Sequence, residues 1–201
     1  MNKKISAVQG LKARKAAWEV LQAVGGGAFA DLALEKIFSL YSFKSIDKSL
    51  ITELSYGAIR QRYFLDCWID FLGKVSAKKQ PPLLRWVLHL GLYQILKMER
   101  IPPAAAISTT VELVKTHKLA KLAPVVNGIL RSALRSKESG IELPKSKNPS
   151  LELAKNESLP VWLADELIAW RGVEDAYKIG KAFNTISPID IRVNKLRADV
   201  K

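Results

Sequence analysis

Apolar residues recur every three or four positions along most of the chain, a spacing typical of the buried face of a helix. One such stripe consists of Leu84, Val87, Leu88, Gly91, Leu92, Ile95 and Leu96. A second, longer stripe consists of Leu50, Leu54, Ala58, Leu65, Trp68, Ile69 and Leu72. Before residue 188, no segment alternates apolar and polar positions as a half-buried strand would. The pattern therefore predicts that residues 1–137 form an all-α domain.

Glycines and prolines predict where these helices begin and end. Gly25–Gly27 should separate two helices within residues 11–40. Pro102-Pro103 and Pro124 should each open a helix, because proline at the first helical position loses no hydrogen bond. Asp47 is expected to cap the helix that follows it.

The periodic pattern stops after residue 137. Residues 138–158 contain prolines and mixed charges, which predicts a linker or a surface arm. A new unit should occupy 159–201, with one short helix closed by Gly172 and another over Val173 to Asn184. Apolar residues then alternate with polar ones at Ile189, Ile191 and Val193, which predicts a strand.

The charge of the chain favours a polyanionic partner. Lys and Arg exceed Asp and Glu by 13, and the pI is near 9.8. Nucleic acid fits, since neutralising phosphates releases condensed counterions. An anionic membrane is the competing explanation, but the sequence has no apolar run long enough to span a bilayer and no signal-peptide pattern. We therefore expect a cytoplasmic protein that does not bind membranes.

Four sequence motifs occur in the order found in one family. They are ARKAAWEVLQAV (Ala13–Val24), LITELSYGAIRQRYFLDCWIDFL (Leu50–Leu72, with Glu53, Tyr56, Gly57, Arg60 and Asp66), IPPAAAISTTVELVK (Ile101–Lys115) and VVNGILRSALR (Val125–Arg135). Together they resemble the NusB-like RNA-binding domain, in the variant found at the front of bacterial 16S ribosomal RNA cytosine-5 methyltransferases of the Sun or RsmB family. The resemblance covers about Lys12 to Arg135.

This resemblance implies a NusB-like helical bundle, a linker and the beginning of a methyltransferase half. Arg192-Val193-Asn194 stands where the family's first strand leads into that half. We expect the S-adenosylmethionine site and the catalytic cysteines to lie beyond Lys201. The chain would then be a fragment that binds 16S ribosomal RNA, with a ribosomal protein as a second implied partner, and without activity of its own.

Two other functions stay open at this point. One is a stand-alone NusB-type transcription antitermination factor, although residues 159–201 would be unusual for it. The other is a helical protein-interaction module whose basic residues serve only solubility. Binding to ribosomal RNA over a salt series would separate RNA binding from the interaction module, because phosphate contacts give a steep salt dependence.

Basic residues gather in two parts of the sequence. Residues 1–15 carry Lys3, Lys4, Lys12, Arg14 and Lys15 with no acid, and residues 115–147 carry eight basic residues against Glu138 and Glu142. In the family it resembles, the first helix and the turn before the last helix contribute to the RNA-binding surface. The expected RNA-binding residues are Lys12, Arg14, Lys15, Lys118, Lys121, Arg131 and Arg135.

No catalytic, cofactor or metal site is predicted within these residues. Cys67, the only cysteine, lies on an apolar helix and is interpreted as a structural thiol. His89 is expected at the surface or packed between helices, and His117 is expected to cap a helix end. Trp18, Trp68 and Trp86 follow helical patterns and are interpreted as core residues rather than base-stacking platforms.

Overall fold

The computed structural model describes residues 2–185, 192–194 and 197, with side chains described from Gly10 onward. Its α-helices are α1 (Asn2–Gly25), α2 (Ala30–Leu40), α3 (Ser45–Arg60), α4 (Arg62–Leu72), α5 (Pro82–Lys97), α6 (Pro103–Lys115), α7 (Ala123–Glu138), α8 (Pro149–Glu157) and α9 (Val161–Phe183). Short 3-10 turns, η1 (Ala77–Lys79) and η2 (Ala120–Leu122), precede α5 and α7. The prediction of an all-α domain is confirmed for these described residues.

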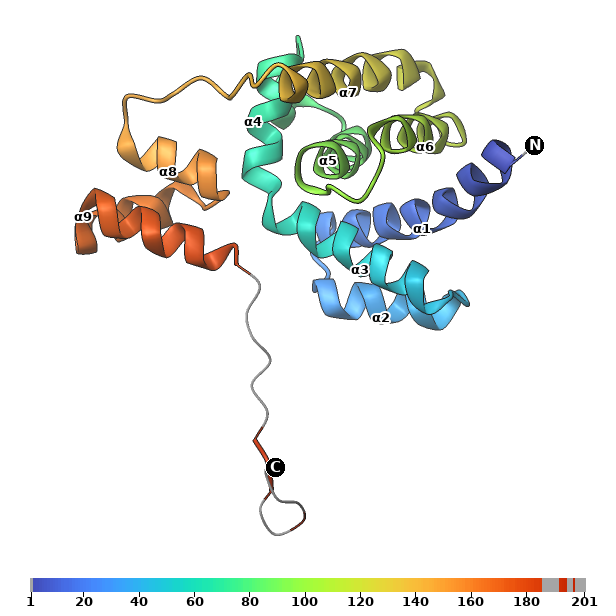
Figure 1. The fold of residues 1–201 in the computed structure, drawn as a ribbon, viewed down its shortest axis with the longest axis horizontal. Coiled ribbons are helices and arrows are strands. Elements are labelled where there is room, and N and C mark those ends of the chain that lie inside the picture. The colour runs from blue at the N-terminus through green and yellow to red at the C-terminus, as the bar shows by residue number, and fades with distance from the viewer. Residues whose placement is uncertain (1, 186–191, 195–196, 198–201) are drawn as a thin grey trace.

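Helix α5 forms the centre of the larger unit. Every residue from Trp86 to Ile95 is buried, so this helix is enclosed on all sides. Helices α1, α3, α4, α6 and α7 pack around it, as Figure 1 shows. Because α5 carries polar residues in this buried segment, those groups need partners on the surrounding helices.

Two of the motif residues on α3 serve the contact with Tyr93 of α5. The Tyr93 hydroxyl donates a hydrogen bond to a carboxylate oxygen of Glu53. Gly57 leaves room for the tyrosine ring, since a Cβ there would overlap Cζ of Tyr93. Glu53 and Gly57 therefore both have a packing role in the contact between α3 and α5.

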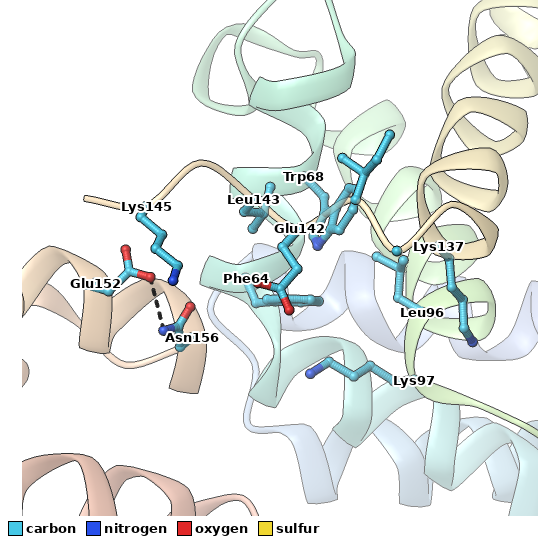
Figure 2. A pocket seen from close by; sticks show the side chains of 12 residues that line it. Phe64, Trp68, Leu96, Lys97, Lys137, Glu142, Leu143, Lys145, Glu152 and Asn156 are labelled. Atoms are coloured by element: carbon cyan, nitrogen blue, oxygen red, sulfur yellow. Dashed lines mark hydrogen bonds between the residues drawn. The ribbon is translucent and has the colours of Figure 1, made fainter. Parts of the chain in front are cut away.

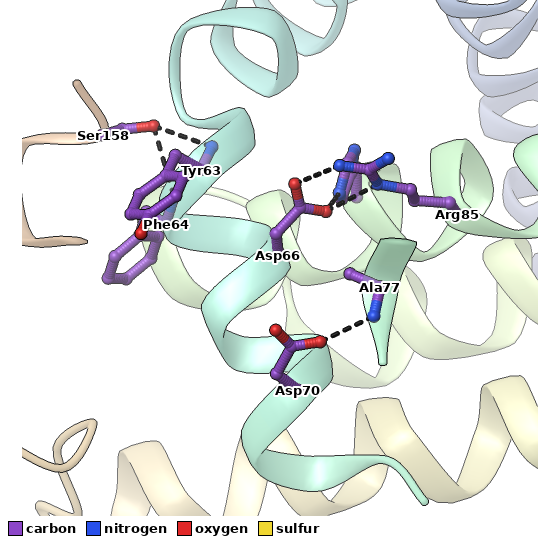
Figure 3. A network of polar contacts seen from close by, with 8 residues as sticks. Tyr63, Phe64, Asp66, Asp70, Ala77, Arg85 and Ser158 are labelled. Atoms are coloured by element: carbon purple, nitrogen blue, oxygen red, sulfur yellow. Dashed lines mark hydrogen bonds and ion pairs between the residues drawn. The ribbon is translucent and has the colours of Figure 1, made fainter. Parts of the chain in front are cut away.

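Asp66 of α4 holds two side chains of α5. Its carboxylate accepts hydrogen bonds from both ends of the Arg85 guanidinium (Figure 3) and lies 2.8 Å from Nε2 of His89. Burial would raise the pKa of Asp66, but the hydrogen bonds from His89 and Arg85 outweigh it and lower that pKa. His89 was expected either at the surface or packed between helices. It is fully buried, so the second alternative is correct.

Residues 138–158 are not a simple linker, because they contain helix α8. Asn148 caps it, its side-chain oxygen accepting from the backbone N–H groups of Ser150 and Leu151, and Pro149 occupies the first turn. Pro149, one of the prolines that suggested a linker, thus lies at the start of a helix. Leu153 and Ala154 are fully buried in a small second core with α9.

Helices α8 and α9 form a hairpin beside α4, at one side of the larger unit (Figure 1). Gly172 interrupts α9 with φ 76° and ψ 171°, so the predicted break between two helices is confirmed. The predicted strand at 189–193 falls mostly on residues outside those described. Residues 192–194, which the structure does describe, have no regular secondary structure.

Two predicted helix caps are wrong, while the predicted proline boundary is confirmed. Helix α3 begins at Ser45 after Lys44, so Asp47 lies within its first turn instead of capping it. Helix α6 ends at Lys115, and His117 packs edge-on against Trp18 with ring centroids 4.5 Å apart. Pro103 does open α6, as expected.

Candidate nucleic-acid interface

Helix α1 presents two lysines to solvent along one narrow stripe. Lys12 and Lys15 are exposed, whereas Ala13, Ala17 and Trp18 are buried. The Lys15 ammonium also lies 3.9 Å from a carboxylate oxygen of the half-buried Glu19, in an ion pair that is weak because solvent screens the exposed lysine. Both lysines remain available for contacts with an anionic partner.

The contact between Trp18 and His117 brings the second basic cluster to α1. Trp18 is anchored by a hydrogen bond from its indole N–H to the carbonyl of Leu83, and His117 packs against its ring. Lys118 follows His117 directly, and Lys121 lies in η2; both are exposed. We call Lys12, Lys15, Lys118 and Lys121 the α1–η2 surface.

Arg14 does not belong to this surface. Its side chain is 5% exposed, and its Nε donates to Oε1 of Gln94 at 2.6 Å. A second guanidinium nitrogen donates to the carbonyl of Gly10, and burial lowers the Arg14 pKa to about 10. The prediction that Arg14 contacts RNA is therefore wrong: it satisfies the buried amide of α5 instead.

Arg131 and Arg135 are exposed on α7, the helix that directly follows η2. Helix α6 packs against both α1 and α7 and lies between them in Figure 1. Arg131 lines a groove of about 420 Å³ between α6 and α7, where its Nε donates to Oδ1 of Asn127 at 3.1 Å. The amide of Asn127 is thus engaged within its own helix.

Sequence reasoning missed a group of aromatic residues beside α1. Tyr41 and Phe43 follow the end of α2, and the Lys12 ammonium lies 5.2 Å from the centroid of the Phe43 ring. Lys48 lies 5.6 Å from the ring of Phe38. The signal in the sequence was the closeness of aromatic and basic residues in FSLYSFKSIDK, where three aromatic residues are followed by two lysines.

The single cysteine is not an activated nucleophile. Burial, followed by the nearby carboxylate of Asp70, raises the pKa of the Cys67 thiol to about 11. A thiolate attacks readily only when its pKa is lowered by a positive environment. Trp18, Trp68 and Trp86 are each at most 5% exposed, which confirms their interpretation as core residues.

A groove of about 490 Å³ lies between α4, the end of α5 and the segment before α8 (Figure 2). The Lys97 ammonium sits 4.1 Å from the centroid of the Phe64 ring, and burial lowers the Lys97 pKa. Lys137 donates to the carbonyl of Ile95, and Asn156 donates to Glu152. Because several of its polar groups are paired within the protein, we interpret this groove as part of the contact between the two helical units.

Within the described ranges, no helix is both long and apolar enough to cross a membrane. The same ranges contain no group of histidine, cysteine and carboxylate side chains placed to hold a metal ion.

Comparison with known proteins gives one family match. The NusB family matches residues 11–135. A probable ribosomal RNA small subunit methyltransferase B from Synechocystis sp. is 32% identical over 93% of this chain and 42% of its own length. A protein of the same name from Bacillus subtilis is 32% identical over 86% of this chain and 38% of its own length. The chain thus spans about two fifths of these relatives.

Two solved structures share the fold. The crystal structure of PH0851 superposes with a TM-score of 0.68 at 18% identity, covering 94% of this chain and 42% of that protein. NusB from T. maritima superposes with a TM-score of 0.56 at 22% identity, covering 67% of this chain and 93% of that protein.

Proposed function

The chain belongs to the NusB family, and from that premise we propose that its α1–η2 surface binds RNA. The observation that carries this proposal is the contact between Trp18 and His117, which places exposed lysines from two distant parts of the sequence on neighbouring elements. Lysines in this arrangement hold phosphates and orient the nucleic acid without reading its sequence. Arg131 and Arg135 would add phosphate contacts for an RNA that extends from η2 along α7.

We further propose that the RNA is that of the small ribosomal subunit. The relatives from Synechocystis and Bacillus carry this substrate in their names. In such a protein the region described here would hold the RNA while a separate catalytic part methylates it at C5 of a cytosine. S-adenosylmethionine would supply the methyl group to that part.

Cys67, the one cysteine of the chain, does not fit the catalytic role. Burial and the nearby carboxylates of Asp70 and Asp66 raise the pKa of Cys67 more than the positive charge of Lys155 lowers it, so its thiol is not activated as a cysteine nucleophile must be. We therefore assign binding, and not methyl transfer, to the described residues.

The α8–α9 hairpin supports this proposal over a stand-alone antitermination factor. NusB from T. maritima superposes on 67% of the chain, whereas PH0851 superposes on 94%. The hairpin lies after the last helix of the NusB match, which ends at residue 135. An additional packed unit of this kind is expected if the domain is joined to another one.

The test is the salt dependence of RNA binding by the wild type and by paired variants. The double variants Lys12→Gln/Lys15→Gln and Lys118→Gln/Lys121→Gln each remove two charges from the α1–η2 surface. The control is Lys178→Gln/Lys181→Gln, which removes two exposed charges from α9 at the other side of the molecule. Affinity for a fragment of small-subunit RNA is measured by fluorescence anisotropy at several salt concentrations.

We expect each lost phosphate contact to lower the slope of log affinity against log salt by roughly 0.7 to 0.9. The control should keep the wild-type slope. Equal slopes for all three variants would overturn the proposed surface, and absence of RNA binding by the wild type would overturn the function. A further variant, Arg14→Met, should lower stability but leave the slope unchanged, since Arg14 is buried.

A further inference from the structure

The exposed stripe of α1 is bordered by a different element on each side. Around the helix axis, Trp18 lies about 60° to one side of Lys15 and Ala16 about 100° to the other. Trp18 contacts His117 before η2, while Ala16 lines a small hollow with Tyr41 and Phe43. The lysines of α1 therefore lie between a basic turn and an aromatic segment.

The aromatic segment is partly open to solvent. Tyr41 is 42% exposed, and its ring centroid lies 6.1 Å from that of Phe43 at an interplanar angle of 64°. Phe43 in turn contacts Phe38, with centroids 6.4 Å apart. The contact with Phe38 fixes the Phe43 ring, while the Tyr41 ring stays partly exposed to solvent.

The hollow beside these rings is small and is lined by both aromatic and charged side chains. It encloses about 110 Å³ and is lined by Lys12, Lys15, Ala16, Glu19, Tyr41 and Phe43. Pockets for drug-sized ligands are roughly 300 Å³ or more, so this hollow suits one flat group of a larger molecule lying across the surface. Lys44 and Lys48, which follow Phe43 in the sequence, are also exposed, and the Lys48 ammonium lies 5.6 Å from the centroid of the Phe38 ring.

We propose that Tyr41 and Phe43, flanked by Lys12 and Lys15, form a stacking site for an unpaired base of single-stranded RNA. The proposal rests on the RNA-binding function above and names the form of RNA that the surface prefers. Aromatic rings accept the face of any unstacked base, while lysines hold the adjoining phosphates. In a duplex the base faces are already stacked, so a duplex could use only the lysines.

The test compares two RNAs with the same number of phosphates, a short oligouridylate and a fully paired hairpin. The variants are Tyr41→Leu, which removes the ring but keeps an apolar side chain, and Tyr41→Phe, which keeps the ring. The matched control is Trp170→Leu, because Trp170 is a 68% exposed ring beside a cation, Arg171, on α9. Affinities are measured by anisotropy after thermal unfolding has shown that each variant is folded.

We expect Tyr41→Leu to weaken oligouridylate binding roughly 5- to 150-fold, the range reported for loss of one stacked base, with the salt slope unchanged. Hairpin affinity should stay at the wild-type value, and Tyr41→Phe and Trp170→Leu should bind oligouridylate normally. Equal oligouridylate affinities for Tyr41→Leu and wild type would overturn the stacking site. If the lysine variants still flattened the salt slope in that case, RNA binding itself would stand.

A second measurement does not depend on any substitution. Oligouridylate containing 4-thiouridine is photo-crosslinked to the wild-type protein, and the attached peptides are identified by mass spectrometry. We expect crosslinks to the peptide that contains Tyr41 and Phe43. Crosslinks confined to other segments would overturn the proposal.

Discussion

Ser158 caps helix α4 from outside that helix, its hydroxyl accepting a hydrogen bond from the backbone N–H of Tyr63 at 3.0 Å (Figure 3). The same oxygen lies 3.3 Å from the backbone nitrogen of Phe64. Ser158 itself ends α8 in the left-handed conformation, with φ 55° and ψ 39°. A residue in the segment expected to be a linker thus satisfies the exposed donors at the start of a helix in the main bundle.

Replacement of Ser158 tests this cap. Ser158→Ala should lower the free energy of unfolding by about 0.5 to 2 kcal/mol, because two backbone donors lose their acceptor. Ser158→Gly loses the same hydroxyl but adopts the left-handed conformation without steric strain, so it should be the more stable of the two by about 1 kcal/mol. Urea unfolding measures both, and equal stabilities would contradict the role of the backbone conformation.

Gly57 and Gly128 should respond to alanine with opposite signs. A Cβ at Gly57 would overlap the ring of Tyr93, so Gly57→Ala should destabilise the protein by about 1 to 3 kcal/mol. Gly128 lies on the exposed side of α7 with no atom within 4 Å of an added Cβ, so Gly128→Ala should stabilise it by about 0.5 to 1 kcal/mol. Thermal unfolding of both variants checks the contrast, which a destabilising Gly128→Ala would contradict.

Stability should fall on acidification through His89. Burial lowers the His89 pKa below its usual value, against the opposing effect of Asp66, so the ring is neutral in the folded state. The neutral ring then donates a hydrogen bond from Nε2–H to Asp66. Nδ1 has no hydrogen-bond partner, so a proton added at Nδ1 would have no acceptor.

Between the lowered pKa and the unfolded value of about 6.5, the unfolded chain binds more protons than the folded one. The free energy of unfolding should therefore decrease as the pH falls from about 7 to 5. Asp66, whose pKa is also lowered, adds a further loss only below about pH 4. His89→Gln should flatten the profile between pH 7 and 5 in urea titrations, and an unchanged slope there would contradict the assignment.

Alkylation of Cys67 should reflect its raised pKa. In the folded protein, the rate with iodoacetamide should keep rising from pH 8 to pH 10, because the thiol pKa is about 11. In the urea-unfolded chain the rate should level off above about pH 9, as for an ordinary thiol. A plateau near pH 9 in the folded protein would show an unperturbed thiol.

Local patterns in the sequence were sufficient for most of the helices. The stripe from Leu84 to Leu96 predicted α5, and Pro103 and Gly172 marked a helix start and a break as expected, because periodicity and proline or glycine geometry act over a few neighbouring residues. Helix α8 was missed, since its Asn148-Pro149 start has the same composition as a turn. Only the packing of Leu153 and Ala154 against α9 distinguishes the helix start from a turn.

The sequence by itself determined the charge of the protein and the two segments in which its lysines gather. Which of those cations face solvent was decided by tertiary structure. Arg14 and Lys15 are neighbours on one basic helix, yet Gln94 holds Arg14 in the core while Lys15 stays exposed. The contact of Trp18 with His117, and of Lys12 with Phe43, joins residues far apart in the chain. Such pairs depend on how helices pack around α5, a long-range arrangement that no local period encodes.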